Sequence, residues 1–225
     1  MSDSDCEGFF ENDWDECGDV AWSEFDWEKY LQAQDDLLHR YLAHYETLRD
    51  NPARVDEVAS LMGWDPGQRG NEDGATDRAD AAEAAGSGDG IDPYTFLKSP
   101  VFVATKALYL SLKRGWERIA TDTAKVPQPL ALALQTSLYR GEEHALLGVQ
   151  ALDFGDYTMA VSLFKRALRE LNQTFALARE AGQAGRQGAV WQEDATPRLF
   201  DLREIWLRVI HECRQVLERR VDDEG

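Results

Sequence analysis

Apolar residues recur every three or four positions along most of this chain, which is the spacing of one face of an α-helix. The sequence has no alternating pattern that would predict a β-strand. The clearest helical segment is 157–181, because its apolar positions alternate between spacings of four and three, as in long packed helices. The pattern predicts one short and five long helices, over 22–50, 53–62, 95–121, 130–153, 157–181 and 197–220.

Prolines and glycines mark where the predicted helices end. Pro127 and Pro129 interrupt the pattern, and three glycines interrupt it again over 182–188. Thr196 followed by Pro197 has the composition of a helix start, so we expect the last helix to begin there. Long amphipathic helices with such breaks predict an all-α fold, an antiparallel bundle of four to five long helices.

Composition divides the chain into four parts. Residues 1–21 form an acidic tail that contains aromatic residues, and residues 22–64 form an N-terminal helical segment. Residues 65–92 are rich in Gly, Asp and Ala and lack an apolar period, which predicts a flexible linker. We expect residues 93–221 to form the core of the helical bundle.

The formal net charge of −18 is distributed unevenly. Residues 1–28 carry eleven acids and no Lys or Arg, and residues 66–92 carry seven acids and two arginines. Residues 93–225 carry 17 acids and 18 bases, so the acidity lies outside the predicted core. A field this negative disfavours binding to nucleic acid or to anionic membranes.

The cysteines and the longest apolar stretches indicate the cellular compartment. The three cysteines are scattered, odd in number and form no CxxC pair, which predicts a reduced protein without disulfides. No uncharged apolar run is long enough for a membrane span. We therefore expect a cytoplasmic protein.

Residues 144–171 carry a motif of small and aromatic positions around a predicted turn. Its positions are Leu147, Gly148, Gly155, Asp156, Tyr157, Ala160, Phe164, Ala167 and Leu168. This spacing resembles one tetratricopeptide repeat, which implies that Gly148 and Ala160 face each other across a hairpin that Phe164 fills. No second copy follows at a spacing of 34 residues, so a bundle hairpin with the same packing is the alternative.

Few residues indicate catalysis. Arg140 and His144 share a helix face, at a spacing that resembles that of helical ribonuclease domains but is one residue short. They also fit an exposed pair with the nearby glutamates. Gln34, Thr105 and Gln135 are the polar residues that the periodicity places toward the core, too few to indicate a site for chemistry. The four histidines form no paired Glu-x-x-His motif, so we predict neither a metal nor a cofactor.

The N-terminal region is the strongest candidate for a binding function. Acidic neighbours keep its aromatic residues soluble until a partner covers them, while a solubilising tail is the alternative. The candidate binding residues are Phe9, Phe10, Trp14 and Trp22, and on the basic helix after the linker Lys106, Lys113 and Arg114. The tail could cover that basic face in cis, or an acidic partner could bind there in trans.

We therefore predict a non-enzymatic helical protein for protein–protein interaction or scaffolding, with an unidentified protein partner. A helical-bundle enzyme, a ligand-binding protein and an RNA-processing domain that uses the Arg/His pair are the alternatives. A homodimer is left open.

Overall fold

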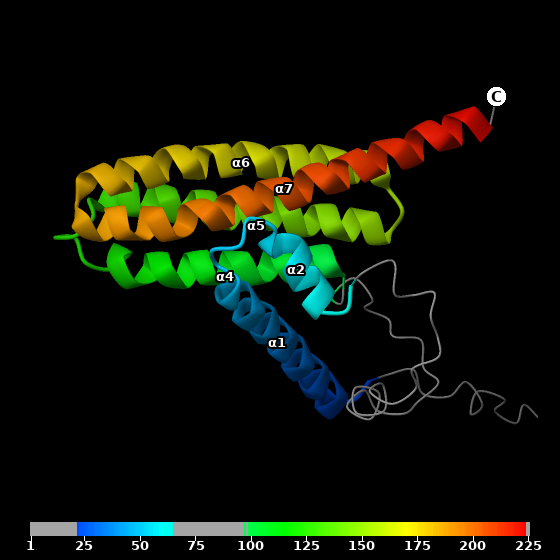
Figure 1. Ribbon diagram of the computed structural model, residues 1–225, viewed down its shortest axis with the longest axis horizontal. Coiled ribbons are helices and arrows are strands. Elements are labelled where there is room, and N and C mark those ends of the chain that lie inside the picture. The colour runs from blue at the N-terminus through cyan, green and yellow to red at the C-terminus, as the bar shows by residue number, and fades with distance from the viewer. Residues whose placement is uncertain (1–21, 65–96, 98, 224–225) are drawn as a thin grey trace, which may run out of the picture.

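The computed structural model describes residues 22–64, 97 and 99–223. In these residues the chain is all α-helical, without a strand, and the helices pack on one another as predicted (Figure 1). The helices are α1 (Glu24–Thr47), α2 (Arg54–Leu61), α4 (Pro100–Ala120), α5 (Gln128–Asp153), α6 (Tyr157–Ala184) and α7 (Arg186–Asp223). The predicted tail at 1–21 and linker at 65–92 lie outside the described residues.

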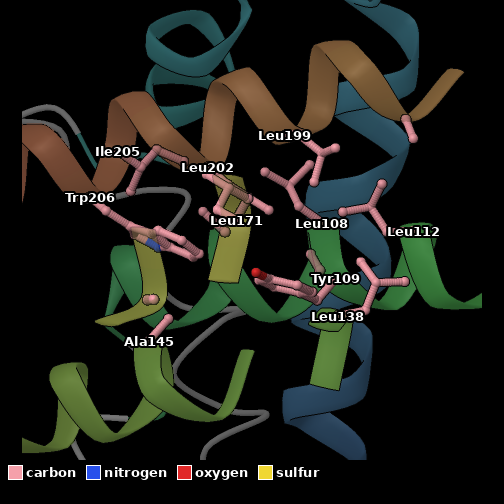
Figure 2. Packing of buried hydrophobic residues seen from close by; sticks show 14 of the residues in the cluster. Leu108, Tyr109, Leu112, Leu138, Ala145, Leu171, Leu199, Leu202, Ile205 and Trp206 are labelled. Atoms are coloured by element: carbon pink, nitrogen blue, oxygen red, sulfur yellow. The ribbon is translucent and has the colours of Figure 1, made fainter. Parts of the chain in front are cut away.

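Helices α4 to α7 form the antiparallel bundle, with the most extensive contacts between α5 and α6 and between α6 and α7. Large apolar side chains from all four helices meet in its core (Figure 2). Buried tryptophans need a partner for the indole N–H. Trp206 Nε1 donates to Thr105 Oγ1 at 3.1 Å, and Trp116 Nε1 donates to the carbonyl of Ala131 at 3.3 Å. The largest fully buried side chains of this core include Tyr109, Leu112, Trp116, Leu138, Phe164, Leu171, Leu199 and Trp206.

Glycines let α5 approach its neighbours closely. A Cβ added at Gly148 would lie 3.0 Å from Cε2 of Phe164, and one at Gly141 would overlap the hydroxyl of Tyr109. Both aromatic side chains are fully buried, so each occupies the space that its glycine leaves. Phe164 therefore fills the space beside Gly148 in the hairpin between α5 and α6.

The turn between α5 and α6 also follows from its sequence. Gly155 has a φ of +74°, a conformation that side-chain-bearing residues rarely adopt. Asp156 then caps α6, because its carboxylate accepts a 2.9 Å hydrogen bond from the backbone N–H of Met159. On the α6 side, Ala160 and Ala167 are fully buried, and Tyr157 is partly buried.

Helices α1 and α2 form an arm that crosses the bundle, called here the α1–α2 arm (Figure 1). Ser23 begins α1 with a capping box, in which its hydroxyl accepts from Asp26 N–H and the Asp26 carboxylate accepts from Ser23 N–H. Leu38 and Tyr41 in the second half of α1 are buried, whereas Leu31 in the first half is 48% exposed. α1 therefore joins the bundle as a fifth long helix only through its second half.

The last helix begins earlier than predicted, since α7 runs without a break through Pro197. The expected start at Thr196 was wrong: its hydroxyl donates to the carbonyl of Gln192 at 2.7 Å, inside the helix. Trp191 explains the earlier start, because it is 5% exposed and its ring lies 4.8 Å from that of Trp116. This packing outweighs the cost of a proline inside a helix, about 3 kcal/mol.

None of the described helices combines the length and the apolarity needed to cross a lipid bilayer.

Candidate functional site

A hollow outside the core, called here the α4–α5 groove, lies along the seam of α4 and α5 and reaches Gln34 of α1. Its volume is about 630 Å³. Tyr139 and Leu147 of α5 line it with 48% and 42% of their surfaces exposed, so the groove is open and partly apolar. The lining side chains used in the argument below are Gln34, Lys106, Tyr139, Glu142, Glu143, Leu146 and Leu147.

A buried carboxylate forms the floor of this groove. Glu142 is 5% exposed, and its Oε2 lies 2.5 Å from Nζ of Lys113 while its Oε1 lies 3.4 Å from Nζ of Lys106. The Lys113 ammonium also lies 4.6 Å from the centre of the Tyr139 ring. Burial, and next the Glu142 carboxylate, raise the pKa of Tyr109 well above its ordinary value. The three charged groups of the floor, one carboxylate and two ammonium groups, are therefore paired with one another and leave a net charge of +1.

This arrangement changes the basic face that the sequence predicted on α4. Lys106 and Lys113 belong to that face, but their ammonium groups are paired with Glu142 of the neighbouring helix. Arg114 remains exposed. The positive charge of α4 that is free to attract an acidic segment is smaller than its sequence suggests. Two of its lysines are already paired with the buried carboxylate of Glu142.

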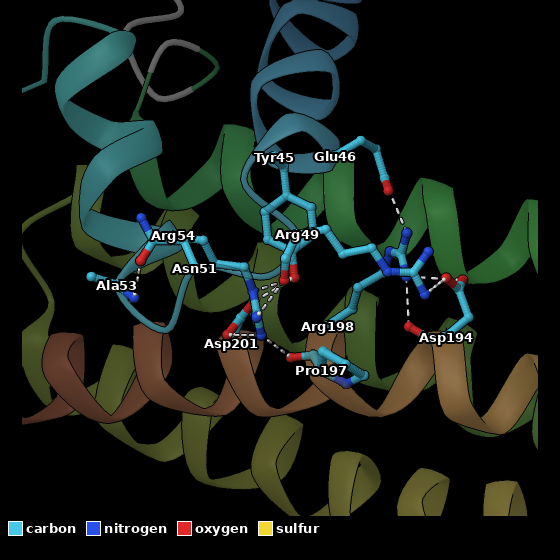
Figure 3. A network of polar contacts seen from close by, with 10 residues as sticks. All are labelled: Tyr45, Glu46, Arg49, Asn51, Ala53, Arg54, Asp194, Pro197, Arg198 and Asp201. Atoms are coloured by element: carbon cyan, nitrogen blue, oxygen red, sulfur yellow. Dashed lines mark hydrogen bonds and ion pairs between the residues drawn. The ribbon is translucent and has the colours of Figure 1, made fainter.

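A second polar site joins the α1–α2 arm to α7, and is called here the Asp201 cluster: Tyr45, Arg54 and Asp201 (Figure 3). Arg54 donates two hydrogen bonds to the Asp201 carboxylate, from Nε at 2.5 Å and from Nη2 at 2.8 Å, and Tyr45 donates a third. Burial, and then the bond to Asp201, raise the pKa of Tyr45, so the phenol keeps the proton that it donates. Arg54 Nη2 also donates to the carbonyl of Pro197 at 3.2 Å.

One turn earlier on α7, Arg198 forms a neighbouring node of the same interface (Figure 3). Its side chain is 6% exposed and pairs with Glu46 of α1 and with Asp194. Arg49, in the turn that follows α1, pairs with the same Asp194 at 2.8 Å. Burial tends to lower the pKa of Arg198, but the hydrogen bond to Glu46 and the nearby carboxylates raise it above its ordinary value. The arm is thus fixed to α7 by two adjoining charge networks.

The sequence missed most of the buried polar groups. Thr105 is buried as expected, whereas Gln34 and Gln135 are only partly buried. Glu142, Arg198 and Asp201 were not expected in the interior. Each is charged, and each has a partner on another helix, a pairing that local spacing does not reveal.

The remaining predicted site residues lie in different places. Trp22 stands at the start of α1, with its ring 5.0 Å from Trp27. Arg140 is exposed, and His144 is partly buried with no hydrogen-bond partner at Nδ1. Phe9, Phe10 and Trp14 lie outside the described residues.

Among the described residues, no three His, Cys, Asp or Glu side chains come together in a way that could hold a metal ion. Comparison of the chain with protein-family models, with curated proteins and with solved structures found no match. The site has therefore to be interpreted from its own geometry.

Proposed function

We propose that this chain is a non-enzymatic interaction protein that binds a helical segment of a protein partner in the α4–α5 groove. The observation that carries the proposal is an open groove whose wall presents two large side chains, Tyr139 and Leu147, each close to half exposed. Aromatic and aliphatic side chains grouped on a concave surface are typical of sites of protein association. The covering helix would come from the partner.

The polar groups near the groove support this proposal over a catalytic one. The Glu142 carboxylate is held by Lys106 and Lys113, and the Asp201 carboxylate by Arg54. A general acid or base needs a group that can exchange its proton with a substrate, and these carboxylates are engaged in ion pairs that join helices. Their arrangement supports a role in fixing the walls of the groove.

The test is site-specific photo-crosslinking with a matched control on the same helix. A photo-reactive residue replaces Leu147 in the groove, or Leu132, which is 67% exposed on α5 but does not line the groove. Any protein cross-linked from position 147 is then purified, and its binding to the intact chain is measured directly. We expect saturable binding that the substitution Leu147→Arg weakens and Leu132→Arg leaves unchanged.

Equal cross-linking from positions 147 and 132 would contradict the proposal, because the groove would then have no preference over an exposed position on the same helix. Binding of the purified partner that is insensitive to Leu147→Arg would contradict it as well.

A further inference from the structure

The shape of the α4–α5 groove limits what can occupy it. On α5, Tyr139 and Leu147 are eight residues apart, about 12 Å at 1.5 Å per residue. That length matches two turns of a docked helix, which would present apolar side chains at positions i, i+4 and i+7. The second wall is the part of α1 around Gln34, and N-terminal to it α1 runs away from the bundle (Figure 1).

The charge around the groove favours a basic occupant. Residues 24–36 of α1 carry five acids and one lysine, a net charge of −4. On the α5 wall Glu143 is exposed and lines the groove. Glu142 is buried and paired with Lys106 and Lys113. The bundle at 100–223 is nearly balanced, with 17 bases and 16 acids. The negative potential is therefore concentrated on the α1 side.

We infer that the groove takes a basic amphipathic helix of a protein partner, with its apolar face on α4 and α5 and its Lys or Arg residues toward α1. This inference rests on the proposed function and names the occupant of the same site. Attraction between exposed charges is screened beyond about 8–10 Å at physiological salt, so binding should weaken as salt rises while the apolar contact persists.

The competing occupant is the chain's own N-terminal segment. Residues 1–21 carry eight acids and no Lys or Arg, so docking in the groove would bring them beside the acidic half of α1. Two of the lysines that could attract the segment, Lys106 and Lys113, are already paired with Glu142. The net charge of −4 on residues 24–36 of α1 exceeds the net +1 that Glu142 leaves on the floor, so repulsion argues against this occupant.

The experiment uses the full chain and three fluorescent peptides, with binding followed by anisotropy. One is a model helix with Leu at i, i+4 and i+7 and Lys on both flanks, the second has Glu in place of Lys, and the third has the sequence of residues 1–21. We expect the Lys peptide to bind at least about tenfold more tightly than either acidic peptide. Leu147→Arg should weaken its binding by about tenfold, and Leu132→Arg, which adds the same charge to the same helix, by less than about twofold.

Three results would overturn the inference. The first is that the Lys peptide shows no saturable binding up to about 1 mM. The second is that either acidic peptide binds more tightly than the Lys peptide. The third is that Leu147→Arg and Leu132→Arg weaken the binding of the Lys peptide equally. If one of these occurs while a cross-linked partner still depends on Leu147, the nature of the occupant is wrong and the proposed function stands. If cross-linking from position 147 also fails, the function itself is contradicted.

Discussion

The substitution Asp201→Asn should release the α1–α2 arm from α7. It keeps the volume of the side chain but removes the charge that faces Arg54, whose side chain is only 14% exposed. Removing one partner of a buried ion pair typically costs about 3–5 kcal/mol. Since Asn can still accept a hydrogen bond and Arg54 keeps some contact with water, we expect a loss of about 2–3 kcal/mol.

A matched control joins the same two helices. Asp56 of α2 pairs with Arg208 of α7, but the two side chains are 60% and 46% exposed. Exposed pairs contribute little because water and salt screen them, so Asp56→Asn should cost less than about 1 kcal/mol. The same chemical change is then applied to two ion pairs of one interface, one buried and one exposed.

The assay is native-state hydrogen exchange of the full chain. Amides near Tyr41 and Val58 should lose protection in Asp201→Asn, while amides near Leu138 in the bundle keep theirs, because the arm opens without the core. The double substitution Arg54→Met with Asp201→Leu should recover much of the loss, since no charge is left buried. Equal effects of Asp201→Asn and Asp56→Asn, or a loss of protection spread evenly over arm and bundle, would refute this reasoning.

Three further predictions concern other sites. Gly148→Leu should destabilise the fold by about 1–3 kcal/mol in urea denaturation, because the added atoms would meet the ring of Phe164, and an unchanged midpoint would mean that this face is not packed. Hydrogen bonds from Arg208 lower the pKa of Asp56 in the folded state, so the small stabilisation by this pair is present above about pH 4 and lost as the pH falls through that lowered pKa. Wild type and Asp56→Asn should therefore differ at neutral pH and converge in stability as the pH falls through the lowered pKa of Asp56, as thermal denaturation would show. Burial, and next Glu212, raise the pKa of the Cys213 thiol, so in a Cys6→Ser, Cys17→Ser variant it should react with a thiol reagent far more slowly than the unfolded chain does.

The helices could be predicted from the sequence because local periodicity determines them. In α6, Val161, Phe164, Leu171 and Ala178 fall on the predicted stripe and are buried. Pro197 shows where that reasoning fails. A proline at the start of an apolar pattern predicts a helix start, and the packing of Trp191 against α4, which keeps the preceding segment helical, is not visible in the local sequence.

The candidate site was much harder to predict, because it depends on pairs of residues that are distant in the chain. Glu142 lies 29 residues from Lys113, and Asp201 lies 147 residues from Arg54. In the sequence, Glu142 is one of the glutamates near Arg140 and His144 that fit an exposed pair, and nothing local places it in the interior. One signal was available: Asp194, Arg198 and Asp201 recur at intervals of four and three on α7, the same spacing that marks a buried helix face.

The most direct test of the central claim, that a partner helix binds in the α4–α5 groove, is methyl NMR of the full chain with labelled leucines during titration with the Lys-flanked model helix. We predict that the methyl signals of Leu146 and Leu147 shift with a common dissociation constant, while those of Leu132 and of Leu207 on α7 do not shift. Shifts centred on Leu207, or shifts that leave Leu147 unaffected, would contradict the claim.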